Sequence, residues 1–274
     1  MDIADFANEL PPSSSLGAVG SMLKEEDLPA PIDTYRRSVA LILAYGTESR
    51  LKENEFIGRL LALGIVAAAE AYFRATLSAC IELCPIAQSG AATKVINLGG
   101  LLWHGKQGFS RSAFEHSSFA SRDELYRACK DYLSVKLDDT KFKSLLDQYE
   151  KVCHLRHAIV HGDGMLPGRN AVQLNVPKYV KPVRIVIHYA NIQDIAAVIN
   201  TLVFTLNREL FAVMCERWAI SWRGRADWDP ALERTTFNKL WAIFHSADGR
   251  RSRRGRSKIT RASCMAEVKA QYGI

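Results

Sequence analysis

The strongest constraint on the fold is the stretch of residues 55–84, which is apolar around most of a helical circumference. Apolar residues on several sides predict a helix that several neighbours contact, so this helix should lie at the centre of the fold. Pro85 cannot continue it because proline has no backbone N–H to donate. A second long apolar helix is predicted from Asn191 to about Trp218. Two such helices indicate an all-α fold with a large core.

Shorter helices are predicted around these two. Residues 32–45 begin the helical structure. Ser121, followed by Glu124, matches a capping box at the start of another helix, because each side chain can accept the other residue's backbone N–H. A further helix begins near Asp138 and carries apolar residues at three-to-four spacing. We expect it to end at Gly162 in the left-handed conformation, which glycine adopts without steric cost.

The pattern changes between residues 170 and 188. Residues 172–176 and 183–187 either alternate apolar with polar side chains or are β-branched, and a stretch with Pro177 and Pro182 separates them. Alternation with a period of two is typical of a half-buried strand. We therefore expect a small β-hairpin, inserted into the helical bundle before the last core helix.

Composition divides the chain into four parts. Residues 1–33 are rich in proline and serine and should form a flexible N-terminal arm, followed by one helical domain over residues 34–218. Residues 219–248 are predicted to be a linker and a helix that docks on the domain or on a partner. Residues 249–274 should be a disordered basic tail, because so much charge and so few large apolar side chains cannot build a core.

Positive charge is concentrated at the end of the chain. The sequence has 36 basic and 29 acidic residues, a formal charge of +7, and the residues from Gly249 onward contribute eight basic residues and one acidic residue. Eight minus one is +7, so residues 1–248 are formally neutral. Clustered cations favour nucleic-acid backbones through counterion release, although a solvated tail that aids solubility has the same composition. The residues predicted to bind nucleic acid are Arg250, Arg251, Arg253, Arg254, Arg256 and Lys258.

Three tryptophans, Trp218, Trp222 and Trp228, alternate with arginines ahead of the docking helix. Aromatic rings beside arginines can stack on unpaired bases. Tryptophans at the edge of a core, however, usually pack against helices. The sequence leaves both interpretations open.

Several classes of protein are disfavoured. The six cysteines form no CxxC pair and lie mostly in apolar surroundings, so we expect reduced, structural thiols. The longest strongly apolar run, Leu60–Ala69, is ten residues long, whereas a bilayer crossing needs about twenty, so no membrane span is expected. The first residues include Asp2 and Asp5 and do not match a signal peptide. The expected location is the cytoplasm.

Arg156 and His161 form the motif with the clearest chemistry, at the end of a predicted helix and directly before Gly162. In RNA cleavage a base removes the 2′-hydroxyl proton, an acid protonates the departing 5′-oxygen, and a cation stabilises the phosphorane. A histidine and an arginine can serve these roles without a metal. On a regular helix the two residues lie about 140° apart, so we expect them to converge at the helix end or across a two-fold axis.

A metal site is an alternative use of the histidines. His154, His157 and His161 share one helical stripe, but the outer two lie about 10.5 Å apart along the axis and cannot bind one zinc ion together. No third ligand accompanies the pair formed by His157 and His161. We therefore expect neither a metal nor another cofactor. A further alternative is structural, in which Arg156 and His161 cap a helix and satisfy buried carbonyl groups.

The segment from Arg156 to His161 resembles the signature of HEPN (higher eukaryotes and prokaryotes nucleotide-binding) domains, which is Arg, a polar residue, three residues and His. The order of Phe119-Ala120-Ser121, the amphipathic run after it and the helix from Ile192 to Arg217 is similar to that of RNase-like prokaryotic members. The resemblance covers about residues 35–218. It implies a helical bundle and a metal-independent endoribonuclease in which Arg156 and His161 from two protomers share one cleft. It also implies a bacterial toxin or phage-defence system, with an antitoxin or sensor protein as a further partner.

Three other side chains are expected to support catalysis: His157, Asp163 and Glu70. His157 would orient the phosphate or bond to the backbone, and Asp163 would hold His161 in one tautomer. Glu70 would either orient Arg156 or pair only with Arg74, one turn along its own helix. Members of the family that lack activity leave a second interpretation open, a non-catalytic module that binds RNA or protein.

Overall fold

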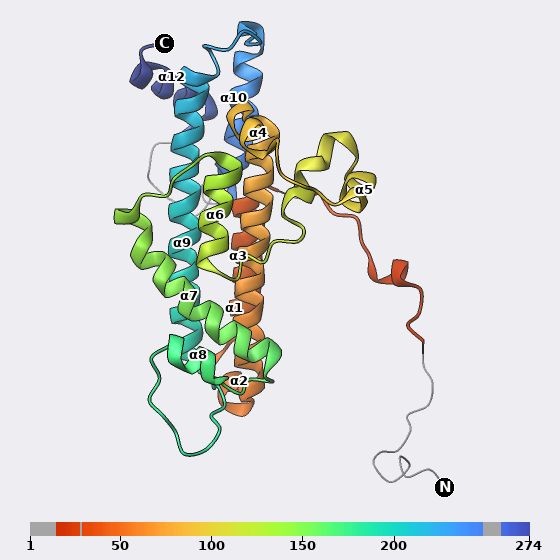
Figure 1. Ribbon diagram of the computed structural model, residues 1–274, viewed down its shortest axis with the longest axis vertical. Coiled ribbons are helices and arrows are strands. Elements are labelled where there is room, and N and C mark those ends of the chain that lie inside the picture. Colours follow the sequence, from red (N-terminus) through yellow and green to blue (C-terminus); the bar gives the residue numbers. More distant parts are fainter. Residues whose placement is uncertain (1–14, 28, 249–258) are drawn as a thin grey trace.

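The computed structural model describes residues 15–27, 29–248 and 259–274, and their regular structure is helical (Figure 1). The α-helices are α1 (Pro31–Tyr45), α2 (Glu48–Glu53), α3 (Glu55–Leu83), α4 (Pro85–Ala91), α5 (Leu98–Gly108), α6 (Arg122–Leu133), α7 (Asp139–His161), α8 (Gly168–Gln173), α9 (Tyr189–Glu216), α10 (Glu233–Phe244) and α12 (Arg261–Tyr272). Shorter helical turns are η2 (Val19–Met22), η3 (Phe109–Phe114), the π-helical η4 (Arg217–Ser221) and η5 (Pro230–Leu232). The predicted all-α class is confirmed.

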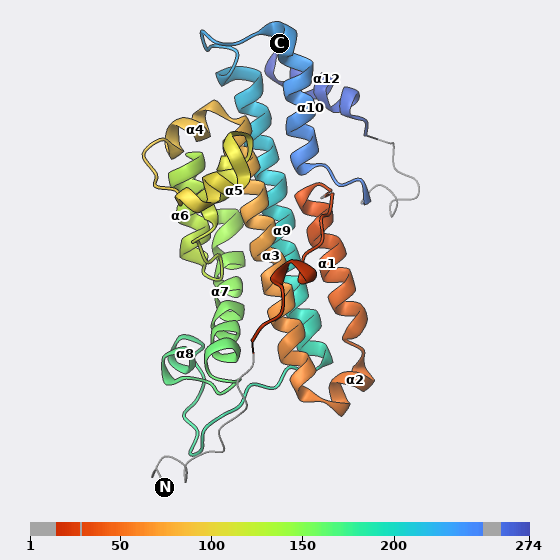
Figure 2. The same ribbon diagram turned by 90° about the vertical axis from the view of Figure 1, so that its right-hand side faces the viewer.

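Helix α3 lies at the centre of the bundle (Figures 1 and 2), where it contacts α1, α2, α4, α6, α7, α9 and α10. Its side chains Ile65, Phe73 and Leu77 are fully buried. The helix ends at Leu83, and Pro85 begins α4, where its missing N–H needs no partner. The prediction of a central helix that ends at this proline is confirmed.

Helix α9 runs beside α3 and holds three other helices through buried polar groups. Tyr72 on α3 donates its hydroxyl to Asn207 Oδ1 at 3.1 Å, and Tyr35 on α1 donates to Asn200 Oδ1 at 2.6 Å. Asn207 Nδ2 in turn donates to the carbonyl oxygen of Phe244, at the end of α10, at 3.0 Å. Each of these hydroxyl and amide groups thus has a partner, as polar groups in a core require.

Helix α10 docks on this core as predicted, with Phe237, Leu240 and Phe244 buried. Trp218 and Trp222, in and directly after η4, are also buried. The structure therefore supports the packing interpretation of these tryptophans and leaves them no exposed face for bases.

Helix α12 contradicts part of the predicted disordered tail. Thr260 Oγ1 accepts the backbone N–H of Ser263 at 3.1 Å at the start of the helix, and Val268 is buried against the bundle. Residues 259–274 are therefore folded. The high charge of these residues led to the prediction of disorder. A cap and one short apolar face are nevertheless enough to form a helix when the core supplies the packing surface.

Parts of the sequence predictions lie outside the described residues. These are residues 1–14 and 28 of the N-terminal arm and residues 249–258 of the tail. Residues 15–27 of the arm are exposed and contain only η2. The tail residues predicted to bind nucleic acid all lie outside the described part: Arg250, Arg251, Arg253, Arg254, Arg256 and Lys258.

The predicted β-hairpin is wrong, because its first strand is not formed. Residues 168–173 form α8, and Asn175 has a positive φ of 53°, which no regular strand contains. Ile185 and Ile187 are buried in alternation, as the pattern predicted. Their segment instead meets the residues after α7, through an isolated antiparallel bridge between Met165 and Arg184.

Two helices are long and apolar enough to span a membrane, judged by length and composition alone. They are α3 and the continuous helix Tyr189–Ser221. In the bundle, 56% and 39% of their most apolar windows are buried, and the core helices of soluble proteins meet the same criterion. The prediction of no membrane span considered only uninterrupted apolar runs, which are shorter than these helices.

The contact between α3 and the segment before α9 gives a test of the packing. A Cβ on Gly58 would lie 2.1 Å from the carbonyl oxygen of Ile187. We expect Gly58→Ala to lower the free energy of unfolding by about 1–3 kcal/mol, because a backbone carbonyl cannot move aside easily. Gly64→Ala is the control in the same helix, since its Cβ would meet only the flexible side chain of Ile42, at 3.1 Å. Equal melting temperatures of the two variants would contradict the close approach at Gly58.

Candidate active site at the end of α7

Helix α7 carries the motif on its last two turns. Asp138 caps its start, and the helix continues without a break to His161. Gly162 has a φ of −123°, so the left-handed ending expected there is wrong. Positive φ values fall instead on Asp163 and Gly164, at 49° and 79°. The chain therefore turns directly after His161.

A buried arginine that the sequence analysis did not identify fixes this turn. The carbonyl oxygen of Gly164 accepts the N–H of Ile185 at 2.7 Å, and Arg59 Nη1 donates to the carbonyl oxygen of Ile185 at 3.4 Å. A Cβ on Gly164 would lie 2.9 Å from Cδ of Arg59. No sequence signal marks Arg59, because its hydrogen-bond partner is a backbone carbonyl 126 residues away. Together these contacts hold the chain that follows His161 in place.

Glu70 on α3 is buried, and its carboxylate lies between two arginines. Arg74 Nη2 donates to Glu70 Oε2 at 2.9 Å, and Arg156 Nη2 lies 3.8 Å from Glu70 Oε1. Arg74 Nη2 also donates to the carbonyl oxygen of Ser117 at 2.9 Å. A buried carboxylate needs such partners because it has lost its hydration. Both predicted contacts of Glu70, with Arg74 and with Arg156, therefore occur together.

His157 and His161 form an exposed pair. Their ring centroids lie 4.6 Å apart, with the planes inclined by 48°. The pKa of His157 is lowered from its ordinary value of 6.5 by desolvation and by the neighbouring positive groups His161, Arg156, Arg169 and His154. Such a cluster favours an anion as ligand, because the anion relieves the repulsion between like charges.

Arg156 and His161 do not meet within one chain. Arg156 faces α3, whereas His161 is on the exposed side of α7 beside His157. Across the part of the chain that the structure describes, no hydrogen bond or ion pair joins Arg156 to His161, or Asp163 to His161. The backbone carbonyl and the carboxylate of Asp163 accept instead from Arg184 Nη1, at 2.5 and 3.2 Å. The structure therefore does not bring Asp163 to the histidine that it was expected to orient.

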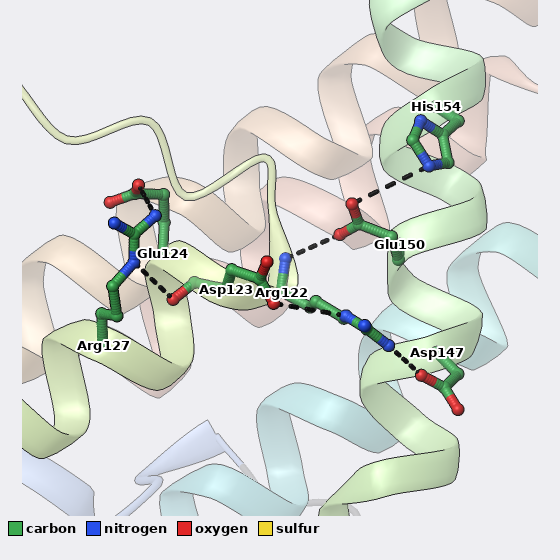
Figure 3. Close-up of polar contacts among 7 residues, drawn as sticks. All are labelled: Arg122, Asp123, Glu124, Arg127, Asp147, Glu150 and His154. Carbon is green, nitrogen blue, oxygen red and sulfur yellow. Dashed lines mark hydrogen bonds and ion pairs between the residues drawn. The ribbon is translucent and has the colours of Figure 1, made fainter. Parts of the chain in front are cut away.

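Towards its N-terminus, the histidine side of α7 continues as a polar stripe that holds α6 (Figure 3). Glu150 Oε2 accepts the backbone N–H of Arg122 at 2.8 Å, and the Arg122 guanidinium pairs with Asp147. Glu150 Oε1 lies 3.8 Å from His154 Nε2. Ser121 makes no side-chain bond to the start of α6, so the predicted capping box is wrong. A carboxylate of the neighbouring helix caps α6 in its place.

A surface pocket of about 360 Å³ lies beside this stripe, between α6, α7 and α8. The pocket presents both cations and carboxylates: Arg122, Asp123, Asp147, Glu150, Lys151, His154 and Arg169, together with the amide of Gln173. Asn170 Nδ2 donates to the carbonyl oxygen of His154 at 3.0 Å and so fixes α8 against α7. Among the described residues, no group of three or more His, Cys, Asp and Glu side chains is arranged to hold a metal ion.

Comparison with known proteins does not assign the chain to a family. No family model, no curated protein and no solved structure matches it. The resemblance to HEPN domains therefore depends on the motif and its predicted helical setting alone.

The cap of α6 gives a test of the polar stripe. Glu150→Ala should lower the free energy of unfolding by about 1 kcal/mol, because the N–H of Arg122 loses its acceptor. Ser121→Ala should change it by no more than about 0.5 kcal/mol, because that side chain makes no cap bond. Denaturant titration measures both values. A larger loss for Ser121→Ala than for Glu150→Ala would contradict the assignment of the cap.

The lowered pKa of His157 gives a second prediction. The folded state binds fewer protons than the unfolded state as the pH falls through 6.5, so protonation of this ring destabilises the fold at acidic pH and not above 6.5. Arg169→Gln removes one neighbouring positive charge and should raise the pKa of His157 towards 6.5. NMR titration of the histidine ring signals measures the change. The signals of His188 serve as the control, and an unmoved His157 pKa would contradict the charge cluster.

Proposed function

We propose that the protein is a metal-independent endoribonuclease of the HEPN type. The observation that carries the proposal is the geometry at the end of α7, where Arg156 lies 3.8 Å from the buried Glu70 and the rings of His157 and His161 lie 4.6 Å apart on the exposed side. These groups supply a cation and two imidazoles, and imidazole is a side chain that can act as general acid or base. RNA is the substrate class that matches this combination of groups and the HEPN resemblance.

In the proposed reaction the 2′-hydroxyl oxygen attacks the adjacent phosphorus while His161 accepts its proton. The bond from phosphorus to the 5′-oxygen breaks, and a protonated imidazole donates a proton to that oxygen, which leaves a 2′,3′-cyclic phosphate and a 5′-hydroxyl. Arg156 stabilises the negative charge of the phosphorane. His157 orients the phosphate through its exposed ring. Every step uses only side chains and RNA.

Two protomers are proposed to form the cleft. Arg156 and His161 lie about 140° apart around a regular helix, and Arg156 is directed towards α3 rather than towards His161. A second copy, related by a two-fold axis, would bring its own His161 to the phosphate that the first copy holds. One histidine then acts as base and its symmetry mate as acid. Homodimerisation is therefore part of the proposed mechanism.

The wider setting is proposed from the resemblance. The protein would act in the cytoplasm as part of a bacterial toxin or phage-defence system, with an antitoxin or sensor protein as a further partner. Free thiols agree with a reducing compartment, since all six cysteines are free and five are buried. The basic residues of the tail would add affinity for the RNA backbone: Arg250, Arg251, Arg253, Arg254, Arg256 and Lys258.

A second candidate function is that of a non-catalytic, HEPN-like module that binds RNA or protein. The observation that favours it is the contact between Glu70 and Arg156. A cation paired with a buried carboxylate can hold two helices together without taking part in any reaction. In that case the histidines would contribute to binding and not to proton transfer.

Incubation with mixed RNA in EDTA distinguishes the two functions. The parent protein should cleave the RNA, and Arg156→Ala and His161→Ala should each lower the rate by at least about 100-fold, because each removes a group that acts in the transition state. Circular dichroism and size-exclusion chromatography verify that the variants fold and dimerise. Arg208→Ala and His116→Ala are the matched controls, since both side chains are exposed and outside the motif.

Retained cleavage in both motif variants would contradict the catalytic roles of Arg156 and His161. Binding of intact RNA by the parent and by both variants, with no cleavage in any of them, would support the module instead. Cleavage that requires an added divalent cation would contradict the metal-independent mechanism while leaving an RNase function in place.

A further inference from the structure

A groove of about 580 Å³ lies between α10 and α12, at the end of the bundle away from α8 (Figures 1 and 2). Helix α10 contributes Arg234, Asn238 and Trp241 to its walls, and α12 contributes Arg261, Met265 and Ala266. The motif on α7 contributes nothing to it. This groove is therefore separate from the candidate active site.

Ion pairs hold the two walls in place. Lys269 Nζ on α12 lies 2.7 Å from Glu233 Oε2 on α10, and Glu233 also pairs with Arg223. The side chain of Val268, on α12, is buried. The groove is thus a formed feature of the fold, and a ligand would not have to create it.

The charge of the groove is positive. Arg234 and Arg261 are exposed on facing helices, and none of the described residues that line the groove is acidic. Among the described residues, no carboxylate lies within ion-pair distance of either guanidinium, whereas Glu233 already pairs with Lys269. Two cations without acidic partners on opposite walls favour an anionic ligand.

The floor of the groove is aromatic and apolar. The rings of Trp241 and His245 are stacked, with centroids 3.9 Å apart and planes within 15°. Met265 and Ala266 line the opposite side. An apolar lining between two arginines matches a nucleotide, whose base packs against apolar side chains while its phosphates pair with the guanidinium groups. An acidic peptide would use the cations but would gain little from the apolar lining.

We propose that the groove between α10 and α12 binds a segment of single-stranded RNA, with a base against Trp241 and Met265 and flanking phosphates on Arg234 and Arg261. Asn238 offers an amide that can hydrogen-bond to the edge of that base. The choice of RNA rests on the proposed function, and the groove adds to it a second contact with the substrate, outside the cleft. Retention of long RNA, rather than cleavage itself, is the expected contribution of this site.

The test measures binding of a labelled, single-stranded 2′-O-methyl RNA to the full chain in EDTA, by fluorescence anisotropy. This probe has no 2′-hydroxyl and cannot be cleaved by the proposed mechanism. Arg234→Glu combined with Arg261→Glu should weaken binding at least about tenfold and should lower the slope of log affinity against log salt by about 1.4, because two phosphate contacts are lost. The matched control, Lys143→Glu combined with Lys239→Glu, makes the same change in net charge on exposed residues outside the groove and should bind almost as the parent does.

A second variant tests the aromatic floor without changing the charge. Ala266 is exposed and lines the groove, so Ala266→Trp should fill it and weaken binding about tenfold while the fold is kept. Equal weakening by the two charge-reversal pairs, or unchanged binding by Ala266→Trp, would overturn the proposal. Displacement of the probe by poly-glutamate as effectively as by unlabelled RNA would also overturn it, in favour of an acidic protein partner.

The outcome is independent of the active site. The loss of binding caused by Arg234→Glu combined with Arg261→Glu should be the same in the parent as in the Arg156→Ala or His161→Ala background, because neither motif residue touches the groove. Loss of binding in the groove variants, in a protein that cleaves no RNA, would support the groove and contradict the nuclease. Unaltered binding in the groove variants, in a protein that does cleave RNA, would contradict the groove and support the nuclease.

Discussion

A carboxylate inside a protein requires positive partners, and the central helix carries one at Glu70. Its two oxygens hold Arg74 on the same helix and Arg156 on α7. Arg74 also donates to the carbonyl oxygen of Ser117, so one buried charge connects α3, α7 and the loop before α6. The cation of the candidate site is thus positioned by the core and not by solvent. Loss of Glu70 would remove the carboxylate that lies near both arginines and leave Arg74 with the carbonyl oxygen of Ser117 as its partner.

The helices that were predicted well are those whose signals are local. The bounds of α3 follow from its apolar circumference and from Pro85, and α10 follows from a regular apolar spacing. The predicted strand pairing, which depended on a partner elsewhere in the chain, failed. The segment 183–187 has the alternation of a strand, but its partner is the chain after α7 and not residues 172–176. A sequence pattern reports which face of a segment is buried and carries no information on what buries it.

The residues of the candidate site also differ in how far the sequence predicted them. Arg156, His157, His161 and Glu70 were identified because their types and spacing suggest chemistry, and the structure places the first three on one helix end with Glu70 beside Arg156. Arg59 could not be found from the sequence, since it acts on a backbone carbonyl. Asp163 was assigned to His161 because it is close in sequence, yet a left-handed backbone turns it towards Arg184.

The bridge between Met165 and Arg184 allows the loop beside the site to change in length during evolution. It closes a loop whose outer residues, 177–182, are all exposed, and Val180 has no protection from solvent. Doubling the length of a flexible loop costs only about 0.6 kcal/mol of closure entropy. New residues inserted there would therefore leave the end of α7 in place. The loop is therefore a position where selection could add residues and so alter which molecules reach the end of α7.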